Sequence, residues 1–68
     1  MKVSDSLKNR EIIIEFYPVG NAVKVSAMDA QSLTEVSIQG PLDAGEETLK
    51  HNALKRLEYV LRKKGVIA

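Results

Sequence analysis

The sequence contains no cysteine and no tryptophan, and it has only one histidine. Without cysteine the chain cannot form disulfide bonds, and the thiolates that hold most structural zinc ions are missing as well. A single histidine cannot complete a zinc site on its own. We therefore expect a domain that binds no metal and gains no stability from covalent cross-links.

Long apolar runs are also absent. No uninterrupted run, the one at residues 12–14 included, approaches the roughly 20 residues that cross a bilayer. Residues 1–10 lack the apolar segment that signal peptides contain. Together with the lack of cysteine, these features predict a cytoplasmic protein with no membrane partner.

The composition that remains is that of an ordinary globular protein. The chain has 68 residues, of which 44% are hydrophobic and 28% charged. This length allows one domain at most, and such a domain buries only about 60% of the surface that its unfolded chain exposes. Because disulfides and metals are excluded, self-association is the remaining common source of extra stability.

The net charge of +1 is unevenly distributed along the chain. Residues 1–48 hold 4 basic and 8 acidic side chains, a net charge of −4, and residues 49–68 hold 6 basic and 1 acidic, a net charge of +5. A basic C-terminal segment is typical of proteins with acidic or nucleic-acid partners. It is equally typical of a helix whose last turn carries cations that complement its dipole.

Alternating apolar and polar residues predict three strands, at about residues 11–17, 22–28 and 34–39. Pro18 to Asn21 has turn chemistry, and Gly40-Pro41 is expected to end the third strand. A hairpin closed around Val19-Gly20 would pair Phe16 with Val23. The same register would place Glu15 opposite Lys24 on the outer face of the sheet.

A long helix is predicted for residues 44–64. Asp43 and Glu46 have the spacing of a capping box, and Gly65 follows where a helix favours a left-handed residue. The helix would be roughly 30 Å long and the strands only roughly 20 Å, so we expect the helix to overhang the sheet. Its core-facing apolar stripe comprises Leu49, Ala53, Leu54, Leu57, Val60 and Leu61.

These elements predict an α+β fold of β-β-β-α order. A three-stranded antiparallel meander, with strand order 1-2-3, is packed on one face by the single C-terminal helix. Residues 1–9 are expected to form a flexible tail and residues 10–68 the single domain. The predicted core consists of Ile12, Ile14, Phe16, Val23, Val25, Ala27, Val36, Ile38, Leu49, Ala53, Leu57, Val60 and Leu61.

Three segments carry a resemblance to known sequences: EFYPVGN at residues 15–21, VKVSAMDA at 23–30 and TEVSIQGP at 34–41. In these segments, and over about residues 11–65 as a whole, the chain resembles a family of short uncharacterised alphaproteobacterial proteins. The resemblance implies a bacterial cytoplasmic protein. It transfers no site residues, because that family is a domain of unknown function.

No set of residues predicts catalysis. His51 is expected on the solvent side of the helix, and no serine or carboxylate has a spacing that would place it beside His51. Glu11, Glu15 and Glu35 share the outer sheet face, where Lys24 accompanies them and water keeps carboxylates ionised. We expect no enzyme, no catalytic residue and no cofactor.

Two binding functions remain open. The first is a small, non-enzymatic interaction module that self-associates or binds another protein through apolar residues outside the core; the candidates are Ile13, Tyr17, Met28, Leu61 and Val66. The alternative is weak nucleic-acid binding by the basic half of the helix, through Lys55, Arg56, Arg62, Lys63 and Lys64. The acidic start of the helix, Glu46-Glu47, argues against the second, because phosphates favour a helix N-terminus without carboxylates.

Overall fold

The computed structural model describes residues 7–68 and confirms the predicted β-β-β-α fold. Strands β1 (Ile12–Val19), β2 (Ala22–Asp29) and β3 (Thr34–Pro41) form an antiparallel sheet in the order β1-β2-β3. A short 3₁₀ turn, η2 (Leu42–Ala44), leads into the helix α1 (Glu46–Lys63). The three strands and the helix were expected from the sequence, although their bounds differ, whereas the 3₁₀ turn was not predicted.

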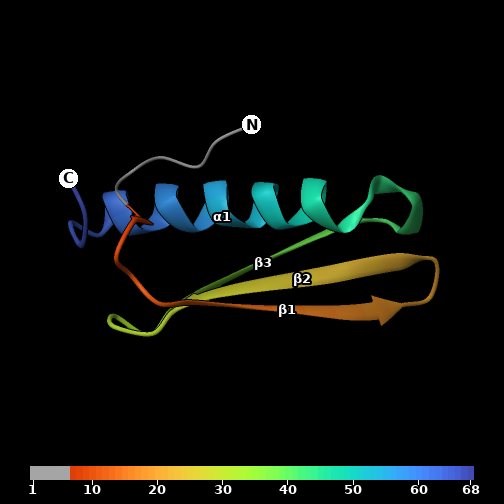
Figure 1. Cartoon of the computed structure of the whole chain (residues 1–68), viewed down its shortest axis with the longest axis horizontal. Coiled ribbons are helices and arrows are strands. Elements are labelled where there is room, and N and C mark those ends of the chain that lie inside the picture. The colour runs from red at the N-terminus through yellow and green to blue at the C-terminus, as the bar shows by residue number, and fades with distance from the viewer. Residues whose placement is uncertain (1–6) are drawn as a thin grey trace.

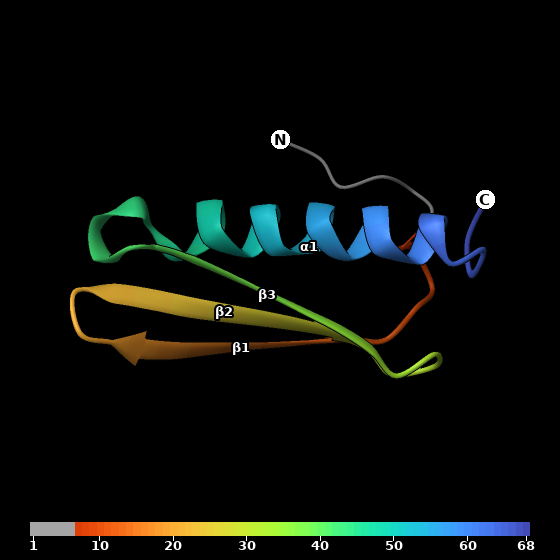
Figure 2. The same cartoon turned by 180° about the vertical axis from the view of Figure 1, so that it is seen from behind.

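The helix does not cover the three strands equally. It packs mainly on β3 and β2, and β1 lies at the side of the sheet farther from it (Figures 1 and 2). The buried core is accordingly built mainly from the middle strand and the helix, to which Leu7 is added from the segment before β1. Its members within the described residues are Leu7, Val25, Ala27, Leu49, Ala53, Leu57 and Leu61.

The other predicted core residues are buried only in part. Six of them pack against the core while keeping some exposed surface, namely Ile12, Ile14, Phe16, Val23, Val36 and Ile38. Val60 also has intermediate exposure. Leu7, in contrast, is buried although it lies in the segment expected to be a tail; residues 1–6 of that segment lie outside the described residues.

The predicted register of the first hairpin was wrong by two residues. Phe16 pairs with Val25 and not with Val23, and Glu15 lies opposite Ser26 and not opposite Lys24. The turn contains only Gly20 and Asn21, and Gly20 takes φ +60° at the first turn position, which suits a type II′ hairpin. Because the shift is by an even number, every side chain stays on the predicted face.

The first strand was predicted to end before Pro18, because proline cannot donate a backbone hydrogen bond within a sheet. Pro18 instead lies within β1, opposite Val23. The amide of Ala30 donates to the carbonyl of Glu11 at 3.0 Å, so odd-numbered residues of β1 bond to β2 and even-numbered ones point to the free edge. The nitrogen of Pro18 thus faces the edge, where no hydrogen bond is lost.

The start of the helix also differs from the prediction. Asp43 lies in the 3₁₀ turn, the N-cap residue is Gly45, and no side chain caps the helix, so the predicted capping box was wrong. The C-terminal end was predicted correctly. Gly65 has φ +78°, and the amides of Gly65 and Val66 donate to the carbonyls of Arg62 and Leu61, the pattern of a Schellman motif.

The expected overhang of the helix is not found. The strands have 8 residues each, because they continue through Val19 and Pro41, and span roughly 26 Å. The 18 residues of α1 span roughly 27 Å. Helix and sheet therefore match in length, and the overhang gives no argument for a partner.

Candidate functional site

Strand β1 has apolar residues on both of its faces. On the outer face, away from α1, Ile13, Tyr17 and Val19 are 40%, 43% and 50% exposed. On the inner face, Ile12, Ile14 and Phe16 are only partly buried, since the helix packs mainly on the other two strands. A strand that is apolar on both faces is typical of a sheet interior, yet β1 lies at the edge.

The backbone of β1 is available at the same edge. Because odd-numbered residues bond to β2, the N–H and C=O groups of Ile12, Ile14 and Phe16 point away from the sheet. Natural edge strands usually carry charges or prolines that discourage further pairing. Here Glu15 and Pro18 are present, but the row of outward groups between residues 12 and 16 is unbroken.

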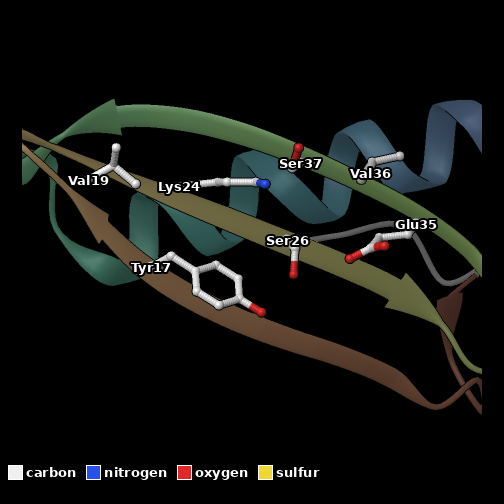
Figure 3. A pocket seen from close by; sticks show the side chains of 7 residues that line it. All are labelled: Tyr17, Val19, Lys24, Ser26, Glu35, Val36 and Ser37. Atoms are coloured by element: carbon white, nitrogen blue, oxygen red, sulfur yellow. The ribbon is translucent and has the colours of Figure 1, made fainter.

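A shallow groove of about 440 Å³ crosses the outer face beside β1 (Figure 3). The ring of Tyr17 forms one wall, and Lys24, Ser26 and Glu35 supply polar groups from β2 and β3. The hydroxyl of Tyr17 donates to the Glu15 carboxylate at 2.6 Å, and this bond is the main cause that raises the pKa of Tyr17. The outer face therefore combines apolar surface with charges of both signs.

A buried ion pair lies at the end of the sheet where β2 turns into β3. The Nε and Nη2 atoms of Arg10 donate to the two carboxylate oxygens of Asp29 at 3.0 and 2.7 Å. Asp29 is fully buried, and it also accepts bonds from the backbone amide and hydroxyl of Ser32 at 3.1 and 2.6 Å. The hydroxyls of Ser32 and Thr34 lie 2.9 Å apart, and Lys64 donates to Thr34 at 3.1 Å.

The contacts of this cluster indicate a structural role and not a catalytic one. Hydrogen bonds from Arg10, and to a lesser extent from Ser32, hold the pKa of Asp29 well below its ordinary value. A carboxylate with so low a pKa and with its oxygens already bonded is a poor general base. The cluster instead ties the segment before β1, the β2–β3 turn and the end of the helix together.

The β2–β3 turn contains a strained residue. Leu33 has φ +60°, a left-handed conformation that costs a leucine about 1–2 kcal/mol, and its side chain is 73% exposed. We expect Leu33→Gly to raise the free energy of unfolding by up to about 1 kcal/mol, because glycine adopts this conformation without strain. Urea denaturation would measure the change, and a loss of stability would show that the leucine side chain makes a stabilising contact.

The basic residues of the helix do not form one surface. Lys64 bonds to Thr34, and Arg62 lies 3.8 Å from Glu58 and donates to the carbonyl of Ala68. Lys55 is exposed. The other two predicted contact residues, Arg56 and Lys63, each lie 5.8 Å from the ring centre of Tyr59, which is 53% exposed.

The remaining predicted residues are placed as follows. Met28 is half-buried opposite Ile13, and Val66 is 36% exposed beyond the helix. Leu61 is fully buried in the core and has no surface to offer a partner. His51 was expected in solvent, but it is half-buried, and its Nε2 atom is buried without a hydrogen-bond partner.

Sequence reasoning missed the ion pair, Tyr59 and the exposed Val19. Arg10 and Asp29 are isolated charges in polar segments, and only the three-dimensional structure shows that they meet. Val19 was assigned to the turn. Tyr59 could have been found, because Arg56 and Lys63 follow the spacing that places residues on one helix face.

Metal ligands are not gathered at one place in the part of the chain that the structure describes. Among residues 7–68 no group of three histidine or acidic residues could hold a metal ion. Over the same range no helix is long and apolar enough to cross a membrane. The apolar edge strand β1 is therefore the strongest candidate for a functional surface.

Comparison with known proteins identifies the domain without assigning it an activity. Residues 9–64 match the family described as Domain of unknown function (DUF6898). No curated protein and no solved structure matches the chain.

Proposed function

We propose that this chain, which belongs to the DUF6898 family, is a non-catalytic interaction module that associates with copies of itself. The observation that supports this proposal is β1, an edge strand that is apolar on both faces and has unpaired backbone groups. An edge of this kind is a template for pairing with another strand.

The energetics favour association. Fully burying a large apolar side chain stabilises a protein by about 1.5–3 kcal/mol relative to leaving it exposed. Ile13, Tyr17 and Val19 are 40–50% exposed and so lack about half of this stabilisation, and the partly buried residues of the inner face lack a smaller part of it. For a domain of 68 residues, with a total stability of about 3–10 kcal/mol, this is a large share.

The proposal predicts a molecular mass that depends on protein concentration. We expect light scattering to detect a monomer–oligomer equilibrium that is nearly insensitive to sodium chloride, because apolar contacts are not screened by salt. Ile13→Glu should shift the equilibrium to the monomer, since it places a charge on the apolar outer face. Leu42→Glu, a matched change at an exposed residue after β3, should leave it unchanged. A strict monomer at millimolar concentration would refute self-association.

A second candidate function is weak binding of single-stranded nucleic acid by α1. One specific observation favours it: Tyr59 is an exposed ring flanked by Arg56 and Lys63, and bases stack on such rings while cations contact phosphates. Against it, the first turn of α1 carries Glu46 and Glu47, and Arg62 and Lys64 already interact within the chain.

The two candidates differ in their response to salt. Nucleic-acid affinity falls steeply as salt rises, because phosphate contacts release counterions. We expect no shift of labelled single-stranded RNA or DNA at physiological salt. A salt-sensitive shift that is lost in Tyr59→Ala and in Lys63→Glu, but kept in Ile13→Glu, would support the second candidate instead.

The proposal also includes the cellular compartment of the protein. We place it in a bacterial cytoplasm, because its sequence resembles alphaproteobacterial proteins and contains no cysteine. We also propose that it works without a catalytic residue, metal or cofactor.

A further inference from the structure

The edge of β1 also indicates how a second copy fits, and this inference rests on the self-association proposed above. We infer that two copies pair their β1 strands in antiparallel orientation about a two-fold axis at Ile14. The two sheets then join into one continuous sheet, with both helices on the same side. This is an isologous contact, in which the same surface serves both copies.

The backbone groups fit this arrangement. In an antiparallel pair, residues that point their N–H and C=O groups at each other exchange two hydrogen bonds. With the axis at Ile14, this residue faces Ile14 of the second copy, and Ile12 faces Phe16. All outward N–H groups of β1 that the structure leaves without a strand partner then find an acceptor.

Pro18 and Glu15 favour the register with the axis at Ile14 over the register with the axis at Glu15. If the axis lay at Glu15, the two Glu15 side chains would be directly opposite each other, and like charges in this position destabilise a sheet. Pro18 would face Ile12 and could donate no hydrogen bond to it. With the axis at Ile14, Glu15 lies opposite Ile13, and Pro18 lies opposite Arg10, which precedes β1.

Side chains on both faces also suit the pairing. On the inner face, Ile12, Ile14 and Phe16 of the two copies form one apolar ladder and complete a burial that α1 leaves unfinished. On the outer face, Glu11 comes to lie beside Tyr17 of the second copy, whose own neighbour on β2 is Lys24. Glu11 and Lys24 are then two strands apart, roughly 10 Å, which two long side chains can bridge.

This complementarity identifies a second copy as the occupant. An antiparallel copy of β1 places apolar side chains opposite the inner-face residues of β1 and keeps the Glu15 side chains of the two copies apart. It also brings Lys24 of one copy towards Glu11 of the other, and the two-fold axis repeats each of these contacts.

Disulfide trapping tests the register, and the absence of native cysteine makes the background zero. With the axis at Ile14, residues 13 and 15 of opposite copies form a pair without hydrogen bonds, with Cα atoms about 4.5 Å apart, which suits a disulfide. Mixing Ile13→Cys and Glu15→Cys chains and oxidising them should therefore give a mixed covalent dimer. Glu15→Cys alone should remain uncrosslinked.

A second cysteine pair and a negative control distinguish specific cross-links from random collisions between exposed cysteines. Glu11→Cys mixed with Tyr17→Cys should cross-link as well, because these residues also face each other. Tyr59→Cys, on the exposed side of α1, mixed with Glu15→Cys should not, and circular dichroism would verify that each variant is folded. The light-scattering mass of each variant would be measured in the reduced state.

The outcomes separate this inference from the proposed function. Mixed cross-links at both pairs support the pairing of β1 about Ile14. Self-cross-linking of Glu15→Cys would overturn it, since the axis would then lie at Glu15. A doubled mass without any β1 cross-link would also overturn it, but would leave self-association standing on another surface. A monomer under all conditions would refute both the pairing of β1 and the proposed self-association.

Discussion

Replacing Leu57 with alanine is expected to unfold a large fraction of the protein. Leu57 is fully buried in the core that α1 forms with the sheet. Removing a buried leucine side chain destabilises proteins by about 3–5 kcal/mol, through lost burial and the cavity that remains. A domain of 68 residues has a total stability of only about 3–10 kcal/mol, so little would remain.

Urea denaturation followed by circular dichroism would measure this loss. The matched control is Leu42→Ala, which truncates the same side chain at a site that is 56% exposed, and it should change stability by less than about 0.5 kcal/mol. If both variants lost the same amount, the packing of α1 on the sheet would not be the main source of stability.

The second large effect is expected at the buried ion pair. Asp29→Asn keeps the size of the side chain but removes its charge, and it leaves the Arg10 guanidinium without a counterion in a largely buried position. Breaking a partly buried pair from one side is destabilising, and we expect a loss larger than the roughly 1 kcal/mol that an exposed ion pair contributes at most. Glu35→Gln, a matched change at an exposed carboxylate of β3, should be nearly neutral.

The pH dependence of stability provides an independent check of Asp29. Its pKa in the folded protein is lowered from an ordinary value of 3.8, chiefly by hydrogen bonds from Arg10. The stabilisation is therefore fully present above pH 3.8 and is lost as the pH falls towards the lowered pKa. The stability difference between wild type and Asp29→Asn should shrink between pH 5 and pH 2, and a constant difference would contradict this assignment.

The faces of the strands could be predicted from the sequence, but their pairing could not. Alternation fixes which side chains share a face, and a shift of two residues leaves every face unchanged. The register depends on the turn, and Pro18 made the turn look longer than it is. The predicted start of the helix was also wrong. Asp43 is a residue type that often caps helices, but it lies in a 3₁₀ turn before α1.

The candidate surface was predicted in part. Ile13 and Tyr17 were identified because they are apolar residues on a polar face, and the structure leaves both exposed. The inner face of β1 is also incompletely buried, because α1 lies mainly over β2 and β3. The sequence pattern of β1 does not indicate where the helix lies over the sheet, so this exposure could not be predicted. The Arg10–Asp29 pair was missed because it joins residues from distant parts of the chain.

Amide hydrogen exchange along β1 would show whether copies of the chain meet at this edge. In a single copy the N–H groups of Ile13, Glu15 and Tyr17 bond to β2, whereas those of the even-numbered residues point to the free edge. If the edge is where copies meet, protection at Ile12, Ile14 and Phe16 should rise with protein concentration in step with the mass, while the odd-numbered amides stay protected throughout. If the even-numbered amides still exchanged rapidly at concentrations where the mass has doubled, the copies would have to meet at a surface other than the edge of β1.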